Sequence, residues 1–193
     1  RLMKAGHITT EKYGMEHLPQ EGGYMLFPNH QGKYDALGIM YAHEKPCSVV
    51  IDDVRSHGIL VKQFIDMIHG KRLVKDDLRQ SMRIIRELAE DTKNGRRFII
   101  FPEGGYYKNH NTVGEFKAGS FKSAVKAKVP IIPVALIDSY KAFEEWTLKP
   151  VVTQVHFLQA IPYDEYKNLS TMQIAVMVRN RIVNTIQEVL SLA

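Results

Sequence analysis

The sequence predicts an α/β protein, a single layered domain with a central mixed, largely parallel sheet flanked by helices. Strand-like runs recur along the chain, and several are almost continuously apolar, which is typical of strands buried on both faces. Helical patterns separate these runs, as expected for alternating α/β layers. No internal repeat, low-complexity tract or obvious linker divides the 193 residues, so we expect one domain over 1–193.

Five strand-like runs define the predicted sheet. Each is short and rich in β-branched, aromatic or other apolar residues. The predicted strands cover residues 24–27, 47–51, 97–101, 131–137 and 151–158.

The clearest helical pattern covers residues 78–93. Apolar residues three and four apart form a stripe that we expect to face the core. Gly95 follows at a position where a helix often ends in a left-handed residue. The predicted stripe consists of Leu78, Met82, Ile85, Leu88, Ala89 and Thr92.

Three further segments have helical character. Residues 117–127 predict a short helix. Residues 58–68 are apolar on more than one side and form either a core helix or a surface that faces lipid or an acyl chain. The last helix, 171–191, follows Ser170, and Gln173 three positions later completes a capping-box pattern.

Composition and charge narrow the possible partners. A formal charge of +5 and a pI of about 9.2 favour an anionic partner, such as nucleic acid, an anionic membrane or a phosphorylated small substrate. The single Cys47 excludes an internal disulfide framework and fits a reducing compartment. No stretch approaches the roughly 18 apolar residues of a membrane-spanning helix. Because the chain starts at Arg1, we expect a fragment or processed product, and an upstream anchor remains an open alternative.

Polar residues follow the first predicted strand directly, in the stretch "FPNHQGKYDALGIM". Asn29 and His30 come at the carboxyl end of the strand, where open α/β sheets usually bind ligands. Gly32 allows a tight turn, and Asp35 falls in the first turn of a predicted helix. The pattern indicates either a helix start with incidental polar residues or a catalytic base with an acid that orients it.

A second polar group follows the predicted strand 97–101, at the start of the long loop 101–116. Glu103, Gly104 and Gly105 form either a solvated turn or part of a site at the same sheet edge as His30. In the second case Glu103 would hold a substrate hydroxyl, and the glycine amides or Lys108 would meet an anion.

Basic residues gather in two other places. Lys117 and Lys122 belong to the predicted helix 117–127 and are either ordinary solvated lysines or a pair that faces phosphate. The stretch "HGKRLVKDD", residues 69–77, places Lys71, Arg72 and Lys75 in a cationic cluster that is either a solvated face or a phosphate site.

Several other chemistries lack their motifs. The chain has no G-x-S-x-G elbow, no G-x-x-x-x-G-K-[ST] loop and no H-E-x-x-H pair. Its histidines and Cys47 have no zinc-ligand spacing, so we expect no metal. The basic residues do not alternate with aromatic ones in a nucleic-acid-binding motif, so we expect no nucleic-acid partner.

The motifs together, in their order and spacing, resemble the glycerolipid acyltransferase family typified by bacterial 1-acyl-sn-glycerol-3-phosphate acyltransferases. "NHQGKYD" matches the first block of that family, Asn-His-x-Ser-x-x-Asp, and "FPEGGY" matches its Phe-Pro-Glu-Gly-Thr-Arg block. "VPIIPV" at 129–134 matches a strand entry of the Val-Pro-Ile-x-Pro-Val kind. The resemblance covers roughly residues 13–137 and implies the glycerolphosphate acyltransferase-like fold.

Two departures from the family pattern concern the phosphate of the acceptor. Gly105 and Tyr106 stand where the family has Thr-Arg, so that arginine is absent. The second family block normally ends in another arginine, near which this chain has Arg72 and Lys75 beside two aspartates. Either the acceptor differs from lysophosphatidic acid, or the basic residues of this chain take over its phosphate, namely Arg72, Lys75, Lys108 and Lys117.

The resemblance implies transfer of a fatty acyl group from acyl-CoA or acyl-carrier protein to a lysophospholipid hydroxyl, without a cofactor. His30 would be the general base, Asp35 would orient it, and Asn29, Glu103, Gly104 and Gly105 would belong to the substrate site. A lipid substrate also implies a membrane surface as partner, at the cytoplasmic face of the cell membrane. The rival functions are a thioesterase or lipid hydrolase that uses the same dyad, and a non-catalytic lipid- or nucleic-acid-binding module.

Overall fold

The computed structural model describes residues 8–74, 77–144 and 149–192. Within these ranges the chain forms seven strands, which all belong to one sheet. The strands are β1 (Ile8–Tyr13), β2 (Tyr24–Pro28), β3 (Ser48–Asp52), β4 (Lys71–Leu73), β5 (Arg97–Ile99), β6 (Ile131–Ile137) and β7 (Val151–Phe157).

The sheet has the order β1-β7-β6-β2-β5-β3-β4. Each neighbouring pair from β6 to β4 is parallel, whereas β7 runs antiparallel to β6 and parallel to β1. The predicted fold class, a mixed and largely parallel sheet flanked by helices, is confirmed. The five predicted strands are β2, β3, β5, β6 and β7, and the sequence interpretation missed the two edge strands.

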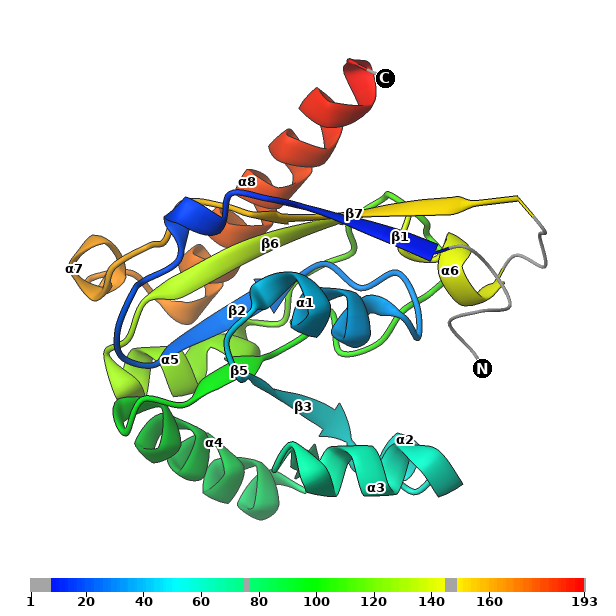
Figure 1. Ribbon diagram of the computed structural model, residues 1–193. Helices are drawn as coiled ribbons and strands as arrows, with labels where there is room; N and C mark the ends of the chain where they lie inside the picture. Colours follow the sequence, from blue (N-terminus) through cyan, green and yellow to red (C-terminus); the bar gives the residue numbers. More distant parts are fainter. Residues whose placement is uncertain (1–7, 75–76, 145–148, 193) are drawn as a thin grey trace.

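Helices cover both faces of the sheet (Figure 1). They are α1 (Asp35–His43), α2 (Asp53–Ser56), α3 (Ile59–Met67), α4 (Leu78–Lys93), α5 (Lys122–Ala127), α6 (Lys141–Glu144), α7 (Tyr163–Tyr166) and α8 (Thr171–Ser191). Two short 3₁₀ turns occur at Met15–His17 and Ala118–Phe121.

The core has two halves, one on each face of the sheet. Alternate residues of β2 point to opposite faces, so Met25 and Phe27 pack with α4, α5 and α8. Tyr24 and Leu26 pack on the other face, with α1 and α3. All five residues of β2 are buried, which makes β2 the central strand from which the polar motif at 29–35 emerges.

The apolar stripe predicted for α4 is wrong in its first turns. Leu78 is 75% exposed and Met82 is 39% exposed, while Ile84, outside the predicted stripe, is buried. The first turn of α4 lies beside β4, the short edge strand, so no further strand of the described chain covers that end of the helix. The other buried residues, Leu88, Ala89 and Thr92, agree with the prediction.

Two predictions about helix ends and one about a helical segment are confirmed. Ser170 and Gln173 form a capping box at the start of α8, with both reciprocal hydrogen bonds present. Gly95, just after α4, has the left-handed φ of 91°. The helix predicted over 117–127 is a 3₁₀ turn followed by α5.

The segment 58–68 contains α3 and fits neither of its two interpretations completely. Ile65 is buried in the core, but Leu60 and Met67 are 74% and 70% exposed. Among the helices of the described ranges, none is both long enough and apolar enough to cross a membrane.

Candidate active site

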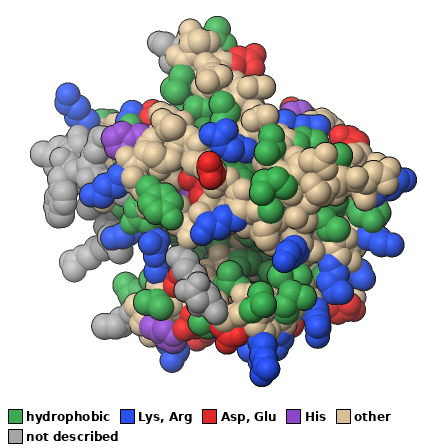
Figure 2. Space-filling view, turned by 180° about the vertical axis from the view of Figure 1, so that it is seen from behind, with side chains coloured by type: hydrophobic (Ala, Val, Ile, Leu, Met, Phe, Trp, Pro, Cys, Tyr) green, Lys and Arg blue, Asp and Glu red, His purple; other side chains and the backbone are tan. Residues whose placement is uncertain are grey.

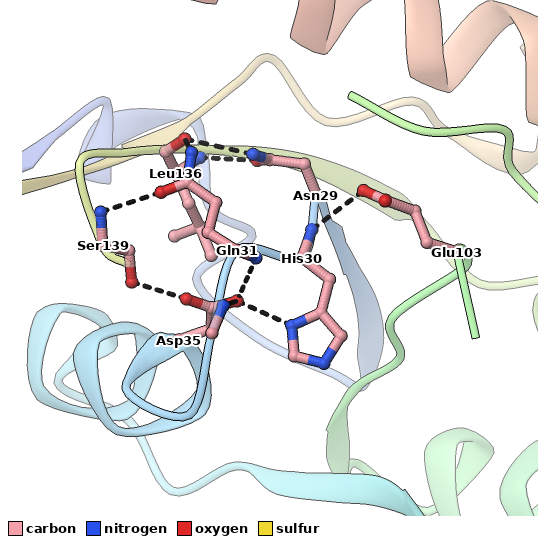
Figure 3. Close-up of polar contacts among 8 residues, drawn as sticks. Asn29, His30, Gln31, Asp35, Glu103, Leu136 and Ser139 are labelled. Atoms are coloured by element: carbon pink, nitrogen blue, oxygen red, sulfur yellow. Dashed lines mark hydrogen bonds and ion pairs between the residues drawn. The ribbon is translucent and has the colours of Figure 1, made fainter. Parts of the chain in front are cut away.

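The dyad proposed from the sequence is formed at the carboxyl end of β2. His30 Nδ1 lies 2.7 Å from Asp35 Oδ2, and Asp35 is the first residue of α1 (Figure 3). A hydrogen bond to the carboxylate holds the proton on Nδ1 and leaves Nε2 as the acceptor. The imidazole therefore has the arrangement of a general base oriented by a buried acid.

The Asp35 carboxylate is fully buried but well supplied with donors. Its Oδ2 atom accepts hydrogen bonds from the backbone amides of Gln31 and Gly32, at 2.6 and 2.9 Å, besides the one from His30. Its Oδ1 atom accepts a 2.5 Å hydrogen bond from the Ser139 hydroxyl. Four donors thus compensate the buried carboxylate oxygens for the loss of water.

Aromatic rings fix the plane of the imidazole. The His30 ring stacks on Phe101, with centroids 4.2 Å apart, and Tyr106 meets it edge-on at 5.2 Å. Because Phe101 follows β5, the neighbouring strand, the two strand ends bring these groups to one edge of the sheet.

Glu103 lies on the side of His30 opposite to Asp35 (Figure 3). Its Oε1 atom accepts a 2.9 Å hydrogen bond from the His30 backbone amide. Its Oε2 atom is buried and has no hydrogen-bond partner among the described residues. Burial raises the pKa of Glu103, and the backbone amides of His30 and Gly114 oppose this shift. Gly114 lies so close to Oε2 that an added Cβ atom would come within 2.6 Å of it, but its amide does not form a well-aligned hydrogen bond.

Asn29 has a different position from the one expected of a substrate ligand. Its side-chain amide donates to the Leu136 carbonyl at 3.1 Å, and its Oδ1 atom accepts from the Leu136 amide at 2.7 Å. Asn29 is buried, and both polar atoms are used on β6. In this geometry it positions the turn that carries His30.

The glycine turn after β5 lies next to a lysine. Gly104 has a φ of 71°, and its amide donates to the Phe101 carbonyl at 3.1 Å. A Cβ atom at Gly104 would come within 2.8 Å of Lys117 Nζ, so the lysine head lies directly over this turn. Gly105 follows and is buried. Lys117 is therefore the sequence-predicted cation that the structure places beside the Glu103 turn.

The other predicted cations are arranged differently. Lys108 is exposed in the loop after the glycine turn and has a left-handed φ of 55°. Arg72 belongs to β4, and its guanidinium bonds to Ser56 and Asp66, at 3.0 and 2.5 Å. Those bonds give Arg72 a structural role. Lys75 lies outside the described residues.

Sequence interpretation missed three residues that complete the site. Gln31 bonds to the Leu136 carbonyl, the Asn111 side chain and the Ser139 amide, all within 2.9 Å. Ser139 follows β6, so its place at the same sheet edge was a usable signal once β6 was predicted. Arg55 lies 5.4 Å from the centroid of Tyr106, a contact between distant segments that no local pattern indicates.

Across the described ranges, no group of three or more His, Cys, Asp or Glu side chains could hold a metal ion. The arrangement supports proton transfer at His30 Nε2 and binding of an anionic, hydroxyl-bearing ligand.

Comparisons with known proteins place this geometry in a family context. A family model described as Acyltransferase matches residues 9–137. The chain is 28% identical over 191 residues to a 1-acyl-sn-glycerol-3-phosphate acyltransferase alpha of Ovis aries, covering 94% of this chain and 64% of the relative. It is 27% identical over 138 residues to a 1-acyl-sn-glycerol-3-phosphate acyltransferase of Borreliella burgdorferi, covering 67% of this chain and 52% of the relative.

A solved structure has the same fold. The 1-acyl-sn-glycerophosphate (LPA) acyltransferase PlsC from Thermotoga maritima superposes with a TM-score of 0.76 at 23% identity. The match covers 93% of this chain and 71% of that structure. The chain spans less than two thirds of the length of the sheep relative and about half that of the bacterial one.

Proposed function

The chain belongs to the acyltransferase family, and from this premise we propose that it moves a fatty acyl group from a thioester to the free hydroxyl of a lysophospholipid. The donor is acyl-CoA or acyl-carrier protein, and the favoured acceptor is 1-acyl-glycerol-3-phosphate, which would give phosphatidic acid. The observation that carries the proposal is the His30–Asp35 pair, with its Nδ1 atom occupied and its Nε2 atom available. The names of the relatives favour this acceptor.

In the proposed reaction His30 Nε2 removes the proton of the acceptor hydroxyl as that oxygen attacks the thioester carbonyl. The imidazolium that forms is stabilised by the Asp35 carboxylate. Collapse of the tetrahedral intermediate breaks the carbon–sulfur bond, and the imidazolium returns its proton to the thiolate. A positioned base of this kind contributes about 10²–10⁴-fold to the rate.

Glu103 and the glycine turn supply the remaining contacts. The Glu103 carboxylate, which the His30 amide holds in place at 2.9 Å, would accept a hydrogen bond from the acceptor and hold it beside His30. The Gly104 amide already donates to Phe101, so the Gly105 amide is the better candidate donor to the oxyanion. Lys117, over the same turn, would bind the phosphate.

The decisive experiment is a product screen by mass spectrometry. Acyl-CoA and acyl-carrier-protein donors are offered with a panel of lysolipid acceptors, and the acylated product is identified. We expect His30→Ala to lose about 10²–10⁴-fold in kcat. The control is His69→Asn. His69 is exposed and precedes the amino end of β4, away from the site, and asparagine tolerates the positive φ of this position.

The screen also separates the rival functions. A thioesterase would release free thiol at the same rate with and without the lysolipid. A binding module would give no turnover in the parent chain. Transfer that survives His30→Ala at most of its rate would show that this mechanism is wrong.

The phosphate assignment has its own test. Lys117→Gln should raise the KM for a phosphorylated acceptor and leave the KM for an uncharged acceptor unchanged. Lys126→Gln removes an equal charge from an exposed position of the next helix, α5, and is the matched control. An equal KM for both variants would exclude Lys117 as the phosphate ligand.

A further inference from the structure

The most exposed large apolar side chains of the described chain gather on three consecutive helices. Val54 of α2 is 83% exposed, Leu60 and Met67 of α3 are 74% and 70% exposed, and Leu78 of α4 is 75% exposed. Leu192, just after α8, and Tyr107, in the loop after the glycine turn, lie elsewhere and are 83% and 71% exposed. Scattered apolar residues on a surface are ordinary, whereas a concentration on neighbouring elements marks an interaction site.

Hydrogen bonds of Arg72 hold these helices as one unit. The guanidinium contacts the Ser56 hydroxyl of α2 and the Asp66 carboxylate of α3. Its carbonyl accepts from the Gln80 side chain in the first turn of α4, at 2.7 Å. In Figure 1 these helices lie together along one border of the molecule, beyond β3. Although α3 and α4 pack on opposite faces of the sheet, Arg72 joins both at the β4 edge, so their exposed apolar side chains lie around that edge.

Cationic side chains accompany the apolar ones. On α4, Arg79, Arg83 and Arg86 recur at helical spacing beside Leu78 and Met82, and these five residues line a hollow of about 380 Å³. In the lower part of Figure 2, hydrophobic side chains lie among Lys and Arg side chains around a hollow. We call this set the interfacial surface; it comprises Val54, Arg55, Leu60, Lys62, Met67, Leu78, Arg79, Met82, Arg83 and Arg86.

The interfacial surface begins next to the candidate dyad. Arg55 lies over the ring of Tyr106, and Tyr106 meets the edge of the His30 imidazole. A ligand held at this surface can therefore reach His30 without crossing a long stretch of protein. The neighbouring Val54, the apolar residue of α2, is 83% exposed.

We propose that the interfacial surface binds an anionic lipid bilayer, with its apolar side chains in the acyl boundary and its cations on the lipid phosphates. This combination of apolar and basic residues is typical of helices that lie in the plane of a membrane. The charge pattern favours anionic lipid over a second copy of this basic chain, which would bring like charges together. The proposal rests on the proposed lipid function for the identity of the partner, and it adds the place on the protein at which the membrane binds.

The test measures partitioning of the 193-residue chain onto vesicles, without turnover. Vesicles of phosphatidylcholine with about a third phosphatidylglycerol are compared with vesicles of phosphatidylcholine alone. We expect binding to the anionic vesicles that weakens as salt is raised. Replacing both Arg79 and Arg83 with Gln should weaken this binding roughly thirtyfold, because each basic residue near an anionic surface contributes about fivefold and the two factors multiply.

The matched control replaces Lys93 and Lys126 with Gln, which removes the same charge from exposed positions outside the surface. A second variant, with Leu60 and Leu78 both changed to Ser, tests the apolar contribution and should also weaken binding. The proposal is wrong if the parent does not bind anionic vesicles, or if the arginine and lysine variants bind them equally well. It is also wrong if the parent is a dimer that the Leu60 and Leu78 changes dissociate.

Vesicle binding and acyl transfer can fail separately. A chain that binds vesicles but gives no acylated product would disprove the proposed function and leave the surface intact. A chain that acylates a dispersed short-chain acceptor but ignores vesicles would disprove only the surface.

Discussion

Replacing Ser139 with Ala tests whether the Asp35 carboxylate depends on its one hydroxyl donor. Ser139 donates to Asp35 Oδ1 at 2.5 Å, and both residues are buried. The change removes a single oxygen and creates almost no cavity. It leaves the three donors to Oδ2 in place, so any effect reports on the lost hydrogen bond.

The expected cost follows from the charge and burial of the acceptor. A hydrogen bond to a charged group contributes about 1.5–3 kcal/mol, and no water can reach the fully buried Asp35 to replace the hydroxyl. We therefore expect Ser139→Ala to lower the free energy of unfolding by about 2 kcal/mol. With a typical urea m-value, this moves the unfolding midpoint by about 1 M.

Ser123→Ala is the matched control. Ser123 is as buried as Ser139, but it donates to the neutral sulfur of Met25, at 3.3 Å. Its loss should cost less than about 1 kcal/mol. Both variants are unfolded in urea, and their midpoints are compared at a common m-value. Ser139→Ala is then introduced into an Asp35→Asn background, where it should lower the free energy of unfolding by less. Equal losses for the two serine variants would refute the argument that Ser139 supports a buried charge.

Three other perturbations have expected outcomes. Gly104→Ala and Gly22→Ala, both at left-handed φ, should each cost about 1–2 kcal/mol in urea unfolding. Only Gly104→Ala should also raise the KM for a phosphorylated acceptor, because it displaces Lys117; an unchanged KM would contradict this. Burial lowers the pKa of His43, so its contribution to stability is complete above the ordinary pKa of 6.5 and is lost as the pH falls below it. In His43→Gln, the free energy of unfolding should therefore decrease less than in the parent as the pH falls below 6.5. An equal decrease in both chains would contradict this prediction. Burial raises the pKa of Cys47 to about 12, so a thiol reagent at neutral pH should label it only on unfolding; rapid labelling of the native chain would show otherwise.

The central strands were predictable because burial on both faces leaves an unmistakable apolar run. β6 was predicted at its observed bounds, Ile131–Ile137, and β2 to within one residue. The edge strands carry no such signal. β4 consists of Lys71, Arg72 and Leu73, and its charges were interpreted as a cationic cluster. Charged residues on an edge strand are a common protection against unwanted pairing, so a polar composition is compatible with a strand there.

Local spacing was sufficient to predict the dyad but not its surroundings. His30 and Asp35 are five residues apart, so the turn and the first turn of α1 can bring them together. The contacts of Asn29 and Gln31 with Leu136 cross more than a hundred residues and depend on β2 pairing with β6. The sequence shows that both side chains are polar, but the order of the strands determines which groups they contact.

Which residues of α4 face the core could not be predicted from periodicity alone. Leu78 and Met82 fit a helical stripe, and periodicity alone implied that they face the core. Where the sheet ends at β4, there is no described strand for them to pack against. An amphipathic pattern reveals that a helix has an apolar side, and only the neighbouring elements determine what covers it.

The four donors around Asp35 have a consequence for the energetics of proton transfer. In water, a new positive charge on an imidazole forces many solvent dipoles to turn, and that reorganisation is part of the barrier. Here the dipoles of the Gln31 and Gly32 amides and the Ser139 hydroxyl already point at the carboxylate. In the proposed mechanism the chain itself would serve as a solvation shell that is already oriented in the folded state, so little reorientation would accompany proton transfer to His30.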